Sequence, residues 1–251
     1  MTSAEQRIFE SAEALARGAA EWLCDLALRS DRRFAVCLSG GSTPRRLYEC
    51  LGSEDFVGRL PWNRMHWFWG DERFVPHDHP DSNYRMARDA MLSRAPIPAA
   101  NIHAIPTEGL SPQEAAKAYE TTLKQFYGDD TLDPHRPLFD VTLLGVGADG
   151  HTASLFPGEP ALLEKRRWAV EVVGAKAEPR ITLTYPALNS SGAVALLATG
   201  SEKRSIVARA LAGDEALPVT RIDPAGTLLW FMDGAATPQE QHDSGSSSIA
   251  R

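Results

Sequence analysis

The chain has 251 residues, and its contents of 43% hydrophobic and 24% charged residues are those of an ordinary globular protein, which excludes a disordered or fibrous chain. The formal net charge of −7, with no basic run to offset it, disfavours a nucleic-acid partner. No apolar stretch is long enough to span a bilayer and the N-terminus is too polar for a signal peptide, so we expect no membrane partner.

The beginning of the chain predicts a helix followed by a strand. Apolar residues spaced by three and four from Ile8 to Leu26 predict a helix over the first 29 residues. The apolar run 34–38 predicts a buried strand. A glycine-rich loop follows and leads into a second helix, with Thr43 as its N-cap and Pro44 in its first turn.

The rest of the chain alternates short apolar runs with helical segments. The expected elements are, in order, a strand over 65–69, a helix over 83–95 capped by Ser82, a helix to about Tyr127 opened by a capping box at Ser111–Glu114, strands over 139–145, 168–173, 180–185 and 193–199, a helix from 201 to 211, and a strand over 227–232. This order predicts an α/β fold with a mostly parallel sheet between helices, in one domain over residues 1–233. The Gln-, Ser- and Gly-rich segment 234–251 is predicted to be a disordered, dispensable tail.

The three cysteines, Cys24, Cys37 and Cys50, indicate a reducing compartment. Their count is odd, no C-x-x-C pair occurs, and each lies in an apolar or amphipathic segment. We therefore expect reduced, buried thiols without a catalytic role and a cytoplasmic location.

Four polar segments directly follow predicted strands: 39–44, 70–73, 145–152 and 199–204. Ligands of parallel α/β sheets bind beyond the carboxyl ends of the strands. These segments therefore predict the place of an active site.

The loop Ser39-Gly40-Gly41-Ser42-Thr43 is a candidate phosphate site, because glycines allow close backbone approach and a helix N-terminus attracts anions. Lys203 lies in the first turn of a predicted helix, where its charge opposes the helix dipole unless an anion binds there. Arg180 is a second candidate cation at the head of a strand. An ordinary turn and a solvated lysine are the alternatives.

The segment Gly145–Gly150 matches the G-x-G-x-x-G fingerprint of dinucleotide-binding proteins. That fingerprint requires a long helix, and Pro157 and Pro160 leave room for only one or two turns. We therefore reject a nicotinamide-dependent dehydrogenase.

His151 is the candidate general acid–base residue, because it lies at a glycine-flanked loop apex after a strand. Asp149 or another carboxylate such as Asp71 would orient it, and the sequence does not choose between them; a purely structural histidine is the alternative. Asp71 and Arg73 end another strand, where Arg73 could hold an anionic oxygen or form an internal ion pair.

A metal site at His77, His79 and Asp81 is disfavoured. Flanking prolines make this segment an extended loop, and no distant ligand cluster is evident. We predict no metal.

The sequence resembles the 6-phosphogluconolactonase family over about residues 5–233. The resemblance rests on six motifs in this order: Leu38-Ser-Gly-Gly-Ser-Thr-Pro44, Trp69-Gly-Asp-Glu-Arg73, Asp81-Ser-Asn-Tyr84, Leu144-Gly-Val-Gly-Ala-Asp-Gly-His-Thr-Ala-Ser-Leu-Phe-Pro157, Pro179-Arg-Ile-Thr-Leu-Thr184 and Thr199-Gly-Ser-Glu-Lys203. It implies a three-layer, modified Rossmann-like fold of the sugar-phosphate isomerase/deaminase type.

The resemblance also implies an activity: hydrolysis of 6-phospho-D-glucono-1,5-lactone in the oxidative pentose phosphate pathway, with no cofactor and no obligate protein partner. The small-molecule phosphosugar lactone would bind through Ser39–Thr43, Arg180 and Lys203. His151 would act as the base, with Asp71 and Arg73 lining the lactone end.

Two other functions stay open at this point: an amino-sugar-phosphate deaminase or isomerase, and a non-catalytic sugar-phosphate-binding module. The related amino-sugar-phosphate deaminases continue the Asp-Gly-His motif with Asn-Glu-Pro, whereas this chain has Leu155-Phe156-Pro157. A phenylalanine cannot accept a hydrogen bond from the imidazole, which favours the lactonase. A non-catalytic sugar-phosphate sensor is the second alternative, although no helix-turn-helix segment precedes residue 34. A serine hydrolase is disfavoured because no G-x-S-x-G motif occurs.

Overall fold

A six-stranded parallel sheet forms the centre of the protein in the computed structural model, which describes residues 4–238. Every neighbouring pair in this sheet is parallel. The strand order is β1 (Glu5–Phe9), β9 (Thr227–Asp233), β8 (Ser191–Ala198), β5 (Phe139–Gly145), β2 (Phe34–Leu38) and β3 (Met65–Trp69). Helices cover the sheet on both sides, so strands such as β2 are buried along their whole length. This confirms the predicted fold class.

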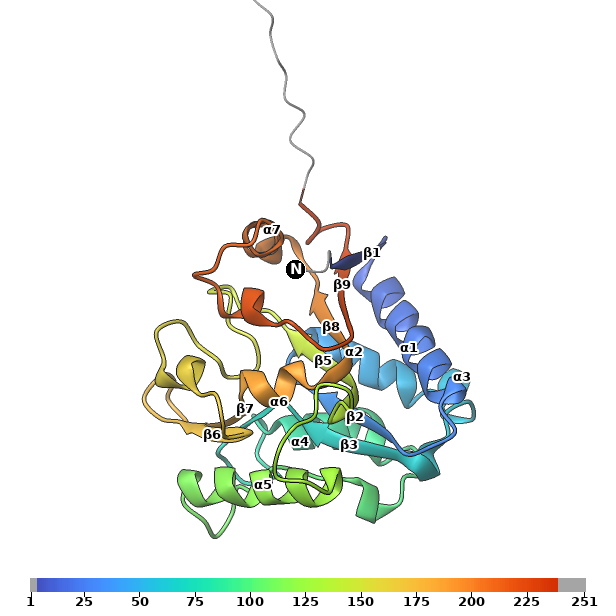
Figure 1. The fold of residues 1–251 in the computed structure, drawn as a ribbon. Coiled ribbons are helices and arrows are strands. Elements are labelled where there is room, and N and C mark those ends of the chain that lie inside the picture. Colours follow the sequence, from blue (N-terminus) through green and yellow to red (C-terminus); the bar gives the residue numbers. More distant parts are fainter. Residues whose placement is uncertain (1–3, 239–251) are drawn as a thin grey trace, which may run out of the picture.

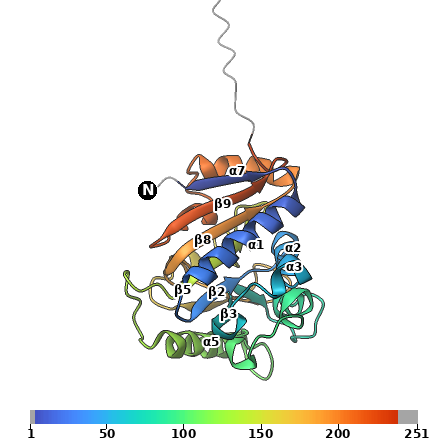
Figure 2. The same cartoon turned by 90° about the vertical axis from the view of Figure 1, so that its right-hand side faces the viewer.

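The sheet lies between two layers of helices. Figure 2 shows α1 (Ala12–Arg29), α2 (Ser42–Leu51) and α3 (Glu54–Val57) in front of one face. On the other side, α6 (Tyr185–Asn189) lies between the main sheet and a smaller sheet (Figure 1).

The smaller sheet has three antiparallel strands in the order β4 (Asp71–Arg73), β7 (Arg180–Leu183) and β6 (Ala169–Val172). Helix α5 (Pro112–Tyr127) packs on β6 and β7. The sequence predicts strands near 168–173 and 180–185, but it does not predict that β4 joins them in a separate sheet. Because β4 follows β3 after a single glycine, this sheet brings Asp71 and Arg73 beside the end of the main sheet.

The predicted helix over the first 29 residues is wrong at its beginning. Glu5–Phe9 is a strand that pairs with β9, and Ile8 is 57% exposed rather than part of a helical face. The helix begins only at Ala12, where the Ser11 side chain accepts the Ala14 N–H at 3.1 Å. The partner strand lies more than 200 residues away, so local periodicity could not reveal the pairing.

Two other helix starts differ in how well the local sequence predicted them. The capping box at Ser111–Glu114 is confirmed, with both reciprocal hydrogen bonds present. The helix after the glycine-rich loop instead begins at Ser42 with Gly41 as its N-cap, so Thr43 is not the cap. The glycine takes that place because its φ of +107° is one that a residue with a side chain rarely adopts.

The predicted helix over 83–95 is divided. Ser82 does cap it, since its side chain accepts the Arg85 N–H at 3.1 Å. Helix α4 (Asn83–Ala87) then changes into a π-helical turn over Arg88–Leu92 and ends there.

Residues 239–251 of the predicted tail lie outside the described residues. The preceding residues 234–237 form a turn directly after β9, and Ala236 within it is fully buried. No helix among residues 4–238 has the length and apolarity needed to cross a membrane.

The three cysteines are free thiols; Cys24 and Cys37 are buried and Cys50 is half-buried. Burial raises the pKa of the Cys24 thiol to about 11. Protonated thiols of this kind are poor nucleophiles, which agrees with the expectation of structural cysteines.

Candidate active site

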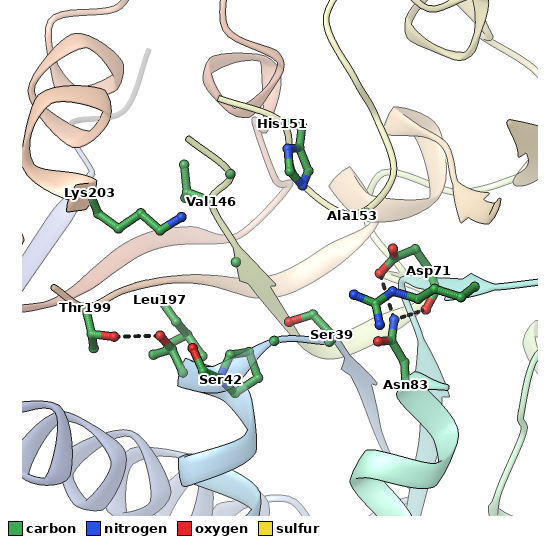
Figure 3. Close-up of a pocket in the computed structure, with 17 residues that line it drawn as sticks. Ser39, Ser42, Asp71, Asn83, Val146, His151, Ala153, Leu197, Thr199 and Lys203 are labelled. Carbon is green, nitrogen blue, oxygen red and sulfur yellow. Dashed lines mark hydrogen bonds between the residues drawn. The ribbon is translucent and has the colours of Figure 1, made fainter. Parts of the chain in front are cut away.

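A pocket opens at the carboxyl ends of β2, β3, β5 and β8 and collects all four of the predicted polar segments (Figure 3). Its lining residues are Ser39–Pro44, Asp71, Arg73, Asn83, Gly145–Gly147, His151, Ala153, Leu197, Thr199 and Lys203. Figure 3 shows Lys203 and Thr199 on one side, Asp71 and Asn83 on the other, and His151 above the space between them.

The glycine-rich loop between β2 and α2 forms the floor of the pocket. Tyr48 of α2 holds the loop from behind: its hydroxyl accepts the Ser39 N–H and donates to the Ser39 carbonyl, both at 2.9 Å. Gly40 must lack a side chain, because a Cβ there would lie 2.0 Å from Asn83 Oδ1. The loop therefore fits tightly between α2 and α4.

The same loop presents unpaired polar groups to the pocket. The buried Ser39 hydroxyl has no hydrogen-bond partner within the described structure. Helix α2 begins at Ser42 without a side-chain cap, so the N–H groups of its first turn remain available. An anion would satisfy both features and would be favoured by the helix dipole.

Lys203 faces this loop from the turn after β8. It lies at the junction of a 3₁₀ turn (Ser201–Lys203) and α7 (Arg204–Leu211). Within residues 4–238 it forms no ion pair, and its side chain extends into the pocket (Figure 3). The Thr199 hydroxyl is hydrogen-bonded to that of Thr43 at 2.7 Å, which ties the two anion-binding segments together.

His151 is held by Asp149, which answers the question that the sequence left open between Asp149 and Asp71. Nδ1 of His151 lies 2.5 Å from Asp149 Oδ1, and the His151 N–H donates to the same oxygen at 3.1 Å. Burial opposes ionisation of Asp149, but the hydrogen bonds from His151 outweigh it and hold the pKa of this carboxyl below its usual value. A carboxylate only accepts hydrogen bonds, so Nδ1 is the donor in this contact, and the neutral form of the ring keeps its lone pair on Nε2.

The loop around His151 has little freedom. A Cβ on Gly147 would lie 2.0 Å from His151 Nδ1, so only glycine leaves room for the ring in this position. The ring of Phe156 packs against the imidazole, with centroids 4.7 Å apart. Ala153, which also lines the pocket, has a φ of +46°, a conformation that non-glycine residues rarely adopt.

Asp71 and Arg73 lie at the opposite end of the pocket from Lys203. Asp71 Oδ2 accepts the Ser154 hydroxyl at 2.7 Å, and Arg73 Nη1 donates to the Asp81 carbonyl at 2.6 Å. Strand alternation turns Glu72 away from the pocket, where it is buried and caps the start of α4 through the N–H groups of Asn83 and Tyr84, both at 2.7 Å. Burial raises the pKa of Glu72, although these N–H bonds oppose the rise.

Asn83 is a lining residue to which the sequence reasoning gave no role. Its Nδ2 donates to the Asp71 carbonyl at 2.9 Å, and its Oδ1 lies beside Gly40. The motif Asp81-Ser-Asn-Tyr84 was the available signal, but it served only to support the family resemblance and the helix cap. Thr199 and Ala153 likewise had no predicted role.

Arg180 is not among the residues that line the pocket. It pairs across strands with Arg73, and burial together with the charge of Arg73 lowers its pKa. Its Nε and Nη1 are buried and have no partner within the described structure. The structure thus brings Lys203 to the Ser39–Thr43 loop, whereas Arg180 is the cross-strand neighbour of Arg73 and does not line the pocket.

The histidine-rich loop has structural contacts. His77 Nε2 lies 2.8 Å from the Ile105 carbonyl, and His79 Nδ1 accepts the Asp81 N–H at 3.2 Å. Among the described residues, no three His, Cys, Asp or Glu side chains are grouped to hold a metal ion.

Comparison with known proteins identifies a family and a shared fold. The family model "Glucosamine-6-phosphate isomerases/6-phosphogluconolactonase" matches residues 10–230. A 6-phosphogluconolactonase from a Nostoc species is 45% identical over 215 residues, which cover 84% of this chain and 87% of the relative.

Solved structures agree with this similarity. The 6-phosphogluconolactonase from Thermotoga maritima is 31% identical with a TM-score of 0.78, covering 92% of this chain and 99% of that one. A monomeric glucosamine-6-phosphate deaminase has the same fold, with a TM-score of 0.78 at 19% identity, covering 92% of this chain and 98% of that one.

Proposed function

Because the chain belongs to the family of glucosamine-6-phosphate isomerases and 6-phosphogluconolactonases, we propose that it hydrolyses 6-phospho-D-glucono-1,5-lactone to 6-phospho-D-gluconate in the oxidative pentose phosphate pathway. The observation that carries the proposal is a single pocket with an anion site at one end and an oriented histidine above its middle. A substrate with a phosphate at one end and an ester at the other matches this arrangement.

The phosphate binds at the end formed by the Ser39–Thr43 loop and Lys203. Lys203 supplies a positive charge, and the Ser39 hydroxyl and the first N–H groups of α2 supply donors that have no other partner. Arg180, which the resemblance includes among the phosphate ligands, is the cross-strand neighbour of Arg73 and does not line the pocket, so we give it no direct contact with the phosphate. Binding energy from the phosphate holds the lactone ring in place for reaction.

His151 acts first as a base and then as an acid. Nε2 takes a proton from a water molecule as the water oxygen bonds to C1 of the lactone. When the bond between C1 and the ring oxygen breaks, Nε2 returns that proton to the departing oxygen. Asp149 keeps the proton on Nδ1 throughout and stabilises the imidazolium that forms between the two steps.

Arg73 is the proposed donor to the oxygen that becomes negatively charged in the tetrahedral intermediate. Its hydrogen bond to the Asp81 carbonyl fixes the guanidinium before the substrate arrives, so little reorganisation is needed during the reaction. Asp71 and Asn83 are hydrogen-bonded to each other. They complete the lining at this end and face the sugar hydroxyls. The scheme requires only water as a co-reactant.

A deaminase or isomerase function is disfavoured by Phe156. Its apolar ring packs on His151, at the position where the related deaminases have a glutamate. A phenyl ring cannot relay a proton for sugar-ring opening. Lactone hydrolysis needs no ring-opening step, so the substitution is compatible with it.

The decisive experiment is proton release after addition of freshly generated lactone. Wild-type protein is expected to release protons far faster than spontaneous hydrolysis does, while the His151→Gln variant should approach the spontaneous rate. A wild-type rate equal to the uncatalysed one would refute the proposal.

We also propose a cytoplasmic location and no obligate protein partner. The free thiols of Cys24, Cys37 and Cys50 support the location, and the absence of an obligate partner is supported by a scheme in which every reacting group comes from one chain.

A further inference from the structure

Asp233, the last residue of β9, is a buried carboxylate that the catalytic scheme does not use. It is 7% exposed, and its hydrogen-bond donors are backbone N–H groups. Gly200 donates to both carboxylate oxygens at 3.1 Å, and Ala236 donates to one of them at 2.8 Å. No cation forms an ion pair with it within residues 4–238. A buried carboxylate is costly unless it is well hydrogen-bonded, and here the backbone N–H groups of Gly200 and Ala236 supply those bonds.

The Gly200 N–H, which donates to Asp233, belongs to the turn that carries Lys203. Gly200 has a φ of +93°, and its carbonyl accepts the Lys203 N–H at 3.1 Å. Two other bonds hold the same turn: Thr199 to Thr43, and Arg204 Nε to the Ala235 carbonyl at 3.0 Å. The turn is therefore fastened on one side to the glycine-rich loop and on the other to the residues after β9.

We propose that Asp233 is a positioning residue: through Gly200 it fixes Lys203 at the phosphate end of the pocket, an inference that rests on the proposed function in assigning phosphate to Lys203. The turn 234–237, predicted from sequence to be part of a dispensable tail, belongs to this support. Parallel pairing of β8 with β9 brings the ends of both strands together, which is why a residue 30 positions later can hold Lys203 in place.

The sign of one mutational effect separates positioning from simple electrostatics. A carboxylate near an anion site repels the anion. If Asp233 acted only through its charge, the wild-type protein would bind phosphate more weakly than the neutral Asp233→Asn variant does. A residue that positions Lys203 has the opposite effect: Asp233→Asn loses strong bonds to Gly200, releases Lys203 and weakens phosphate binding.

The test measures dissociation constants for inorganic phosphate and 6-phosphogluconate by titration calorimetry, and KM and kcat with the lactone. For Asp233→Asn we expect both constants and KM to rise by roughly tenfold, the loss of about one charge-assisted hydrogen bond. The value of kcat should stay within about twofold of the wild-type value, because His151 is untouched.

The control is the Asp214→Asn variant. Asp214 also accepts a backbone N–H, from Ala216, but it lies at the far end of α7 from Lys203. We expect its phosphate affinity to be unchanged.

A double-mutant cycle with Lys203→Ala provides a readout that a merely structural role would not give. If Asp233 acts through Lys203, adding Asp233→Asn to Lys203→Ala causes little further loss of phosphate affinity. Additive losses, unchanged affinity or tighter binding in Asp233→Asn would each overturn the inference.

Two further measurements separate a failure of this inference from a folding defect and from a failure of the proposed function. If Asp233→Asn does not fold, as judged by circular dichroism, Asp233→Glu takes its place: its extra methylene displaces the carboxylate from Gly200, and wild-type phosphate affinity in that folded variant overturns the inference. Absence of lactone hydrolysis by the wild-type protein would refute the proposed function instead, because the phosphate titrations do not depend on turnover.

Discussion

Single carboxylates hold the polar groups that face the pocket. Asp149 fixes His151, Glu72 fixes the start of α4 and with it Asn83, and Asp233 fixes the turn before Lys203. Each of the three accepts backbone N–H groups. Preorganisation of this kind places the groups before the substrate binds, which lowers the cost of reaching the transition state.

The first prediction concerns the single residue His151. His151→Gln should lower kcat by on the order of 10²–10⁴, the usual contribution of a general base. Binding of inorganic phosphate should be retained, because Lys203 and the glycine-rich loop are unchanged. Steady-state kinetics with the lactone and phosphate titration measure the two effects. Near-full kcat in this variant would remove His151 from the role of base and point to Asp71.

The second prediction compares the two candidate phosphate cations. Lys203→Ala should raise KM for the phosphorylated lactone, because the binding free energy is weakened by about 1.5–3 kcal/mol. The variant should also show a smaller preference for the phosphorylated lactone over the unphosphorylated one. Arg180→Ala should change that preference less, because Arg180 does not line the pocket. Rates with both lactones measure the preference. An equal loss in both variants would place Arg180 in the phosphate site.

Two neighbouring histidines lie where β3 meets α5, and we expect them to make the stability of the fold depend on pH. His66 of β3 and His103 lie side by side, with Nδ1 and Nε2 3.1 Å apart, and both pack against Phe126 of α5. Burial, and then the charge of His66, lower the pKa of His103 from 6.5 to about 4. The folded protein therefore holds this ring neutral where the unfolded chain protonates it.

The third prediction follows from the sign of that shift. Between pH 6.5 and about 4 the unfolded chain binds the proton more readily, so the contribution of His103 destabilises the fold progressively as pH falls through this window. Because the ring is half-exposed, we expect a loss on the order of 1–2 kcal/mol. Urea unfolding at pH 7 and pH 4.5 should show a smaller loss for His103→Phe, which keeps the stacking on Phe68. Identical losses in the variant and the wild type would contradict this explanation.

For the molecule as a whole, the fold is shared with both lactonases and deaminases, so the fold does not select the reaction. We infer that the choice depends on Phe156, which packs against His151, the proposed general base. The Phe156 ring provides an apolar contact to the imidazole, and Nζ of Lys176 lies 4.9 Å from the centroid of the same ring.

The fourth prediction tests this selection. The protein should release no detectable ammonia from glucosamine 6-phosphate and should not isomerise glucose 6-phosphate, because nothing at position 156 can relay a proton. A coupled ammonia assay, run beside lactone hydrolysis on the same preparation, measures both reactions. Ammonia release approaching the lactone rate would favour the deaminase.

Local sequence patterns were enough to predict the features that depend on near neighbours in the chain. Apolar runs predicted β2, β3 and β5, and the capping box predicted the start of α5, because burial pattern and capping chemistry act over a few residues. The four polar segments at strand ends predicted where the pocket lies, since parallel strands place their carboxyl ends at one edge.

Which of those residues come into contact depends on the three-dimensional path of the chain. Contacts between distant segments set the pairing of β1 with β9, the separate sheet containing β4, and the positions of Asn83 and Arg180. Loop geometry makes Asp149 rather than Asp71 the partner of His151. Such contacts follow from strand register and from the path of the chain between elements, and local residue patterns do not encode either. Asp233 shows the difference most clearly: its side chain has the same chemistry as any surface aspartate, and only the parallel pairing of β8 with β9 places it beneath the turn that carries Lys203.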